Sequence, residues 1–271
     1  MIKQAIIPLA GLGTRMLPLT SVMPKELLPI NGKPNLEYIM EECVEAGIKE
    51  FIFIISKKKS NIKKYFFDDN FYKKILKKKK DKRVRKEFLK IKKYQKMIKF
   101  VYQNKPRGTG DAVLKCKKYL KGKHFLMLLP DDLIIKKNCS KEMMNLHKKS
   151  KASVIATKKV NKKSVSRWGI LSLKNKKKSH FEISDVVEKP SIGKAPSNYA
   201  IIGRYILPTK IMKEIKKLKP GQGGEIHITD AIRNLIHQGE IFYGNIFKGK
   251  YLDCGTLAGY INSGIEIYKR R

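Results

Sequence analysis

The order of structural signals in the first 55 residues restricts the fold more than any other feature of this sequence. Lys3–Leu9 and Phe51–Ile55 each have the pattern of a buried strand. Between them, Asn35–Ala46 places its apolar residues at the 3.6-residue spacing of an amphipathic helix, and Gly47 follows as a stop signal. Strand–helix–strand order favours parallel strands joined by right-handed crossovers. The sequence therefore predicts an α/β fold.

The remaining signals divide the chain into two parts of different character. In the first part, further buried strands are expected at Ile98–Tyr102 and Phe125–Leu129, with a helical stretch at Asp111–Tyr119. In the second part, short polar links favour antiparallel pairing of four strands, namely Ser153–Val160, Trp168–Leu173, Ile183–Val187 and Tyr199–Leu207. Two helices follow, Lys210–Leu218 and Asp230–His237, the latter with Thr229 as its expected N-cap, and Thr256–Tyr268 closes the chain.

We find no internal repeat and no flexible linker, so residues 1–271 are expected to form one continuous domain. The segment Lys57–Lys96 is dense in lysine and is expected to form one or two exposed helices, the least core-like part of the chain.

The net charge is +38, and lysine supplies most of it, with 52 Lys against nine Arg. Proteins that read nucleic-acid bases favour Arg for its rigid bidentate fork. The lysines are also scattered along the whole chain, as drift towards A-rich codons would leave them on exposed positions. We therefore expect no specific nucleic-acid partner, although the positive field would attract small anionic substrates.

Cysteine spacing and hydropathy favour a cytoplasmic protein. The four cysteines form no C-x-x-C pair, which argues against a zinc ribbon or a disulfide framework. No apolar run approaches the roughly 20 residues that a membrane span requires, and no signal peptide precedes the first strand. We expect no membrane association.

A glycine loop follows the first strand directly, as Gly11-Leu12-Gly13-Thr14-Arg15. It lies at the carboxyl edge of the expected sheet, where α/β proteins bind ligands. The two glycines allow backbone N–H groups to approach a phosphate, and Arg15 adds a charged fork. The dinucleotide fingerprint G-x-G-x-x-G fails, because its last position is Met16.

The stretch from Gly11 to Pro29 resembles the signature of the sugar-1-phosphate nucleotidyltransferases. Their pattern is approximately G-x-G-T-R-x-x-P-x-T followed by P-K-x-L-x-P, and this chain fits every position. The residues Ala10–Pro18 and Met23–Glu26 are most similar to the bacterial members that use UTP and glucose 1-phosphate. Six later segments also resemble family elements, namely Gln103–Ala112, Leu128–Asp131, Trp168-Gly169, Val187–Pro190, Pro196–Tyr205 and Leu252–Gly255.

The resemblance implies a Rossmann-like fold with a mixed central sheet flanked by helices and a smaller antiparallel sugar-binding region. Residues 1–150 would bind the nucleotide, and residues 151–271 would bind the sugar and supply the C-terminal helices. The implied catalytic residues are Arg15, Lys25 and Lys189. The implied nucleotide-binding residues are Ala10, Gly11, Gly13, Thr14, Gln103 and Gly108. The implied sugar-phosphate-binding residues are Gly169, Glu188, Lys189 and Ile201.

The resemblance also implies that Mg²⁺ is held by Asp131 and Asp253. Asp132 falls where relatives are usually apolar, so we expect it to be solvated or to act indirectly beside the metal rather than to bind it. The chain ends soon after Tyr268, where relatives carry a longer helical tail. We expect a homo-oligomer, a dimer or a tetramer.

The expected reaction converts UTP and glucose 1-phosphate to UDP-glucose and pyrophosphate. Two alternatives stay open at this point. A relative that uses dTTP would also present a Gln to the base, because uracil and thymine share their hydrogen-bonding atoms. A polyanion-binding protein on a retired enzyme scaffold would account for the charge, although the intact set of Arg15, Lys25, Asp131, Glu188, Lys189 and Asp253 argues against it.

Overall fold

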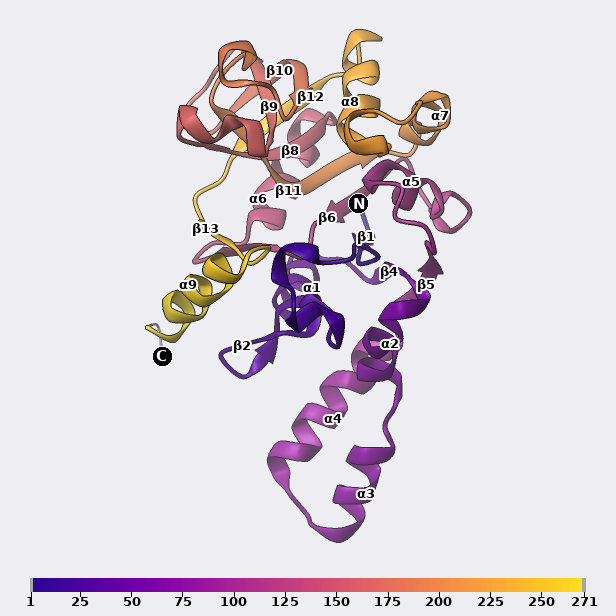
Figure 1. Ribbon diagram of the computed structural model, residues 1–271. Helices are drawn as coiled ribbons and strands as arrows, with labels where there is room; N and C mark the ends of the chain where they lie inside the picture. The colour runs from indigo at the N-terminus through magenta and orange to yellow at the C-terminus, as the bar shows by residue number, and fades with distance from the viewer. Residues whose placement is uncertain (1, 270–271) are drawn as a thin grey trace.

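A mixed sheet of nine strands organises residues 2–269, which are the residues described by the computed structural model (Figure 1). Its strands in spatial order are β5 (Ile98–Tyr102), β4 (Glu50–Ile55), β1 (Gln4–Pro8), β6 (His124–Leu128), β11 (Tyr199–Pro208), β8 (Ser153–Lys159), β12 (Phe242–Ile246), β10 (His180–Glu188) and β9 (Gly169–Lys174). The first four pair in parallel, as their sequence order predicts. The α/β prediction is confirmed.

Helices cover both faces of this sheet, because its central strands alternate their side chains between two apolar cores. In β1, Ala5 and Ile7 face one core while Ile6 faces the other. The first core is covered by α1 (Asn35–Glu45), α2 (Ser60–Phe67), part of α4 (Lys82–Gln95) and α6 (Cys139–Ser150). The second is covered by α5 (Thr109–Leu114), α7 (Ile211–Lys217) and α8 (Ile228–His237).

The second part of the chain extends the same sheet. The ten-residue β11 pairs antiparallel with β6 on one side and with β8 on the other, so the sheet is continuous between the two parts. The pair of β10 with β9 is also antiparallel, as predicted. So is the pair of β10 with β12, although β12 is not one of the four predicted strands. The pair of β12 with β8 is parallel, which the short polar links did not indicate.

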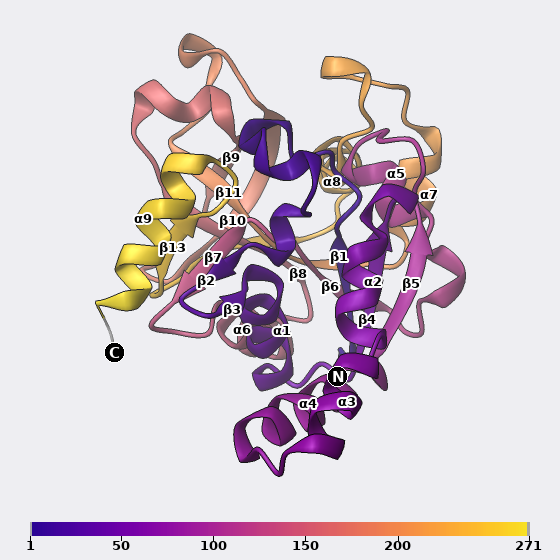
Figure 2. The ribbon, with the colours of Figure 1, turned by 60° about the horizontal axis from the view of Figure 1, so that its bottom comes forward.

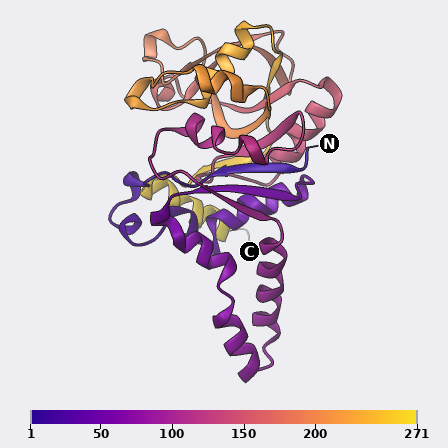
Figure 3. The same cartoon turned by 90° about the vertical axis from the view of Figure 1, so that its right-hand side faces the viewer.

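The lysine-dense segment forms three helices, where one or two were expected. They are α2, α3 (Asn70–Lys78) and α4. We call residues 70–95, which comprise α3 and α4, the helical arm, because they project from the body of the molecule (Figures 1 and 3). The prediction of exposed helices holds for α3, which has no buried residue. It is wrong for α2, where Ile62 and Phe66 are one helical turn apart and fully buried. Their spacing directs both side chains into the core despite the lysines around them.

Two small sheets complete the fold. In one, β7 (Asp132–Ile135) pairs antiparallel with β13 (Lys250–Asp253), and in the other β2 (Pro29–Ile30) pairs with β3 (Lys33–Pro34). The last helix, α9 (Leu257–Tyr268), lies beside β13 and β2 (Figure 2). No helix within residues 2–269 is both long and apolar enough to cross a membrane.

Candidate functional site

The loops that follow β1 and β6 meet at the carboxyl edge of the sheet, and a cavity of about 320 Å³ opens there. The walls of this cavity, which we call the first cavity, include Ala10, Gly11, Arg15, Lys25, Gln103 and Gly108. All six were predicted as site residues. The predicted residues Gly13 and Thr14 are not in this wall. Gly13 instead turns the loop, with a φ of 73°, and its carbonyl accepts a hydrogen bond from Thr20 Oγ1 at 2.9 Å.

Gln103 is held in a fixed orientation inside the first cavity. Its amide nitrogen donates to Asp111 Oδ2 at 2.7 Å and to the Gly108 carbonyl at 3.2 Å. These two bonds use both amide hydrogens. The Gln103 side-chain oxygen makes no hydrogen bond within residues 2–269, so it is the group left to accept one from a ligand.

A second cavity, of about 410 Å³, adjoins the first and shares Arg15, Leu129 and Asp131 with it. Its wall contains the predicted sugar-binding residues Gly169, Glu188 and Ile201, as well as Trp168, Arg167 and Asp253. A Cβ on Gly169 would lie 3.0 Å from Ile201 Cδ1 and 3.2 Å from Glu188 Oε2, so only glycine leaves the cavity open there. The wall does not include Lys189, whose side chain is exposed.

Thr229 serves this second cavity rather than the helix that it was expected to cap. The helix α8 begins at Ile228, two residues before its predicted start at Asp230, and its N-cap is His227. The Thr229 hydroxyl instead donates to Glu188 Oε2 at 2.8 Å. The N-cap prediction is wrong because tertiary contact with β10 gives the hydroxyl a carboxylate acceptor, and a charge-assisted hydrogen bond is stronger than a neutral one.

Two cations converge on Asp131 between the cavities. Lys25 Nζ lies 2.7 Å from Asp131 Oδ2, and Arg15 Nη2 lies 3.3 Å from the same oxygen. Burial alone would lower the pKa of Lys25, but the Asp131 and Glu26 carboxylates raise it above its usual value. Burial would likewise raise the pKa of the Asp131 carboxyl, yet Lys25 and then Arg15 hold it below its usual range. Lys25 and Asp131 therefore form a charged pair at neutral pH.

The backbone that carries Asp131 is fixed by three different elements. Arg204 Nη1 in β11 donates to the carbonyl of Leu129 at 3.3 Å, and Asn35 Nδ2 in α1 donates to that of Pro130 at 2.7 Å. The backbone N–H of Cys254 donates to the carbonyl of Asp131 itself at 2.7 Å. Sequence reasoning missed both roles, because Asn35 lies in no recognised motif and Arg204, although it lies in the family-like segment Pro196–Tyr205, was given no role there.

Asp253 faces the same point in space as Asp131. The N–H of Gly255 donates to Asp253 Oδ1 at 2.8 Å, and Arg167 Nη2 lies 3.3 Å from Asp253 Oδ2. A Cβ built on Gly255 would lie 2.8 Å from Asp131 Oδ2 and 3.2 Å from Asp253 Oδ1. The two carboxylates thus converge beside a glycine that leaves room between them.

This donor set fits Mg²⁺. Magnesium is bound in such sites by one or two carboxylates together with substrate phosphates and water, rather than by an all-protein cage. Asp131 and Asp253 supply the two carboxylates, and no cluster of three or more His, Cys, Asp or Glu residues capable of holding a metal occurs in the described part of the chain. A metal held here would need phosphate oxygens to complete its ligands.

Asp132 is not solvated, contrary to one of the two expectations for it. It is buried, and its Oδ1 accepts from the Tyr251 hydroxyl at 2.7 Å while its Oδ2 accepts from the Gly203 N–H at 2.9 Å. Burial and the neighbouring Asp131 charge raise the pKa of Asp132 to about 6. Both its oxygens accept hydrogen bonds that join β7 to β13 and β11, which favours the expected indirect role over metal binding.

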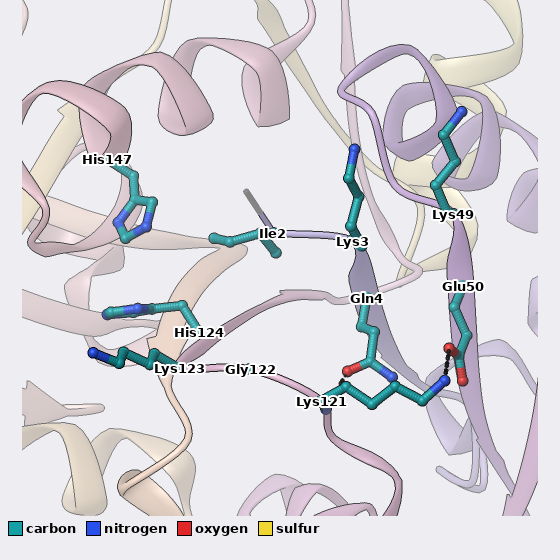
Figure 4. Close-up of a pocket in the computed structure, with 10 residues that line it drawn as sticks. All are labelled: Ile2, Lys3, Gln4, Lys49, Glu50, Lys121, Gly122, Lys123, His124 and His147. Atoms are coloured by element: carbon teal, nitrogen blue, oxygen red, sulfur yellow. Dashed lines mark hydrogen bonds and ion pairs between the residues drawn. The ribbon is translucent and has the colours of Figure 1, made fainter.

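A further cavity, of about 600 Å³, lies elsewhere, at the beginning of β1, β4 and β6 (Figure 4). Four lysines and two histidines line it. In Figure 4 the side chains of Lys3 and Lys49 extend away from the facing rings of His124 and His147. These groups do not converge on one point, and none of the sequence motifs falls in this cavity.

Comparison with known proteins gives matches over nearly the whole chain. Residues 4–269 match the family model described as nucleotidyl transferase. The chain is 38% identical over 274 residues to the putative UTP–glucose-1-phosphate uridylyltransferase of Methanocaldococcus jannaschii, covering 100% of this chain and 95% of that one. It is 36% identical over 268 residues to the UTP–glucose-1-phosphate uridylyltransferase of Bacillus subtilis, covering 98% and 90%. A crystal structure of UDP-glucose pyrophosphorylase complexed with UDP-glucose superposes with a TM-score of 0.88 at 34% identity, covering 100% of both chains.

Proposed function

The chain belongs to the nucleotidyl transferase family, and from that premise we propose that it transfers the uridylyl group of UTP to α-D-glucose 1-phosphate, giving UDP-glucose and pyrophosphate. The observation that carries this proposal is the pair of adjoining cavities that share Arg15 and Asp131. One cavity would hold the nucleotide and the other the sugar phosphate, with the reacting phosphates meeting at the shared wall.

The first cavity suits a uracil base. The Gln103 amide nitrogen donates to Asp111 and Gly108, so these two bonds fix the orientation of the amide. Its side-chain oxygen is then the acceptor that faces a ligand. The N3–H of uracil is a matching donor, whereas N3 of cytosine is itself an acceptor and would meet that oxygen unfavourably. Gly108 lets the backbone pass close to Ile226, since a Cβ there would lie 2.6 Å from the Ile226 carbonyl oxygen.

Transfer requires no covalent enzyme intermediate. An oxygen of the glucose 1-phosphate attacks the α-phosphorus of UTP in line, a new P–O bond forms, and the bond to the bridging oxygen of the β-phosphate breaks. Pyrophosphate leaves with that bonding electron pair. The protein must hold two mutually repelling anions in this geometry and neutralise the charge that develops. We assign Arg15 and Lys25 to the triphosphate, and Glu188 with the Gly169 backbone to the sugar hydroxyls.

Lys189 is assigned to the sugar phosphate, which its long exposed side chain would have to reach by moving. Mg²⁺ bound by Asp131 and Asp253 would supply a positive charge at the phosphates. Lys25 and Arg15 pair with Asp131, and Arg167 pairs with Asp253; Lys25 is the most buried of the three cations, with 14% of its side chain exposed.

The test is pyrophosphate release with Mg²⁺, measured for UTP, dTTP, CTP and ATP, each with and without glucose 1-phosphate. We expect release from UTP only when glucose 1-phosphate is present. Gln103→Leu is expected to raise the KM for UTP by about tenfold, because it removes a buried base acceptor. Gln238→Leu removes an amide outside both cavities and serves as the matched control. Faster turnover with dTTP would contradict the uridylyl assignment, and no turnover with any triphosphate would favour a retired scaffold.

A further inference from the structure

Arg167 forms an ion pair that matches the pair of Arg15 with Asp131. Arg167 is the last residue of the 3-10 helix Lys162–Arg167 and directly precedes Trp168 and β9. Its Nη2 lies 3.3 Å from Asp253 Oδ2, the same distance that separates Arg15 Nη2 from Asp131 Oδ2. Each carboxylate of the candidate metal site is therefore paired with one arginine.

Both arginine side chains are more than half exposed. The Arg15 side chain is 59% exposed and the Arg167 side chain 56% exposed. Ion pairs at such exposure contribute little to stability, whereas a guanidinium binding a phosphate through two parallel hydrogen bonds gains much more. A cation that binds Asp253 would displace Arg167 at small cost and leave its guanidinium available to an anion.

The position of Arg167 indicates which anion that would be. It lines the second cavity, with Gly169, Glu188 and Ile201, and not the first cavity, which contains Gln103. Lys189 lines neither cavity, although its backbone N–H donates to the Trp168 carbonyl at 3.0 Å and so lies beside Arg167. Arg167 is thus a cation already present where the sugar phosphate would bind.

We propose that Arg167 binds the phosphate of the sugar 1-phosphate and exchanges Asp253 for that phosphate when substrate and metal are present. This inference rests on the proposed function, since it assigns a residue to the same second cavity. The competing interpretation is that Arg167 is purely structural and orients Asp253. The two interpretations differ in what happens to metal binding when the guanidinium is removed.

The experiment compares Arg167→Gln, Arg167→Lys and Arg233→Gln with the unmodified protein. Arg233 is the matched control, because its Nε and Nη2 pair with Asp185 at 3.0 and 3.2 Å on the surface of α8, outside both cavities. Binding of glucose 1-phosphate, and of Mg²⁺ alone, is measured by calorimetry, and KM values by pyrophosphate release.

Arg167→Gln is expected to weaken glucose 1-phosphate binding and raise its KM by about 10- to 100-fold, the effect of losing charge-assisted hydrogen bonds. The KM for UTP should change less than threefold, and Mg²⁺ alone should bind as tightly as before or more tightly, because a competing cation is gone. Arg167→Lys should recover part of the loss, and Arg233→Gln should match the unmodified protein.

Unchanged glucose 1-phosphate binding in Arg167→Gln, or weaker Mg²⁺ binding with an unchanged KM for glucose 1-phosphate, would overturn the proposal and leave a structural role. Failure of the proposed function is a different result, since the unmodified protein would then neither bind glucose 1-phosphate nor release pyrophosphate with it.

Discussion

The ammonium group of Lys59 lies 2.7 and 2.8 Å from the two carboxylate oxygens of Glu26. Both residues are buried, at 7% and 1% exposure. Glu26 immediately follows Lys25, so this pair ties the loop that carries Lys25 to the segment after β4. Burial lowers the pKa of Lys59, and the Glu26 carboxylate offsets this only in part. The pair acts on the site by positioning Lys25.

Lys59→Met is therefore expected to destabilise the protein by about 3–5 kcal/mol, because it leaves the Glu26 carboxylate buried and unpaired. The double variant Lys59→Met, Glu26→Leu should recover most of that loss, since replacing a whole buried ion pair by apolar residues is often neutral. Urea unfolding at pH 7.5 measures both. Equal destabilisation by the single and the double variant would show that the pair does not stabilise the loop.

The contrast between Lys59 and Lys25 shows where the sequence is informative. Lys25 lies in a motif whose other positions identify it, whereas Lys59 is the third residue of the run Lys57–Lys59. Only tertiary packing distinguishes a buried lysine from its exposed neighbours in such a run. The same holds for Asn35 and Arg204. Asn35 donates to the distant carbonyl of Pro130, and Arg204 donates to the distant carbonyl of Leu129 as well as to the Glu42 carboxylate.

The elements could be predicted more closely than the contacts. The strand at Ile98–Tyr102 has the bounds that its apolar pattern predicts, and the helix α1 ends one residue before its predicted end. These patterns are local and repeat with the period of the element. The start of α8 was missed because Thr229 is a good local N-cap by residue type, whereas its hydroxyl donates to the Glu188 carboxylate on the neighbouring strand β10.

The stability of the protein is expected to fall between pH 6.5 and 4 because of His124. Burial, the adjacent His147 and nearby lysines lower the pKa of His124 to about 4 (Figure 4). In this window the unfolded chain binds a proton that the folded chain does not, so acid favours unfolding. The contribution is about 1 kcal/mol, less than the full shift implies because the ring is only half buried.

Urea unfolding of His124→Gln at pH 7.5 and pH 4.5 provides the measurement. The variant should lose less stability than the unmodified protein between the two pH values, whatever its stability at pH 7.5. An identical loss in both proteins would assign the acid sensitivity to other groups.

The helical arm should dominate any binding of nucleic acid. Residues 70–95 contain thirteen Lys and Arg against Asp81 and Glu87, a net charge of +11 in 26 residues. Phosphate-only binding loses affinity with a log–log salt slope of about −0.9 per neutralised phosphate on duplex DNA. Replacing Lys77–Lys80 by serine should reduce that slope by up to about four without changing turnover, since the arm lies away from both cavities. Sub-micromolar affinity for one defined sequence at physiological salt would contradict the expectation that binding occurs through phosphate contacts alone.

The adjacent carboxylates Asp131 and Asp132 are expected to respond differently to the same change. Asp131→Asn keeps the shape but removes the charge that faces Lys25 and the candidate metal position, so kcat at saturating Mg²⁺ should fall by about 10²–10³. Asp132→Asn should be much milder. Its amide oxygen can still accept from the Gly203 N–H, and its amide nitrogen can donate to the Tyr251 hydroxyl, which can serve as acceptor in place of donor.

Both variants should remain folded, because the backbone around Asp131 is fixed through the carbonyls of residues 129–131 and not through its side chain. Far-UV circular dichroism and thermal unfolding check the fold, and kcat is compared at the same saturating Mg²⁺ concentration. Tyr251→Phe is the companion variant, since it removes the hydroxyl from Asp132 without touching Asp131. If Asp132→Asn were inactive and Asp131→Asn nearly unaffected, the metal carboxylate would be Asp132, one residue further along the chain, and the convergence of Asp131 with Asp253 would have another purpose.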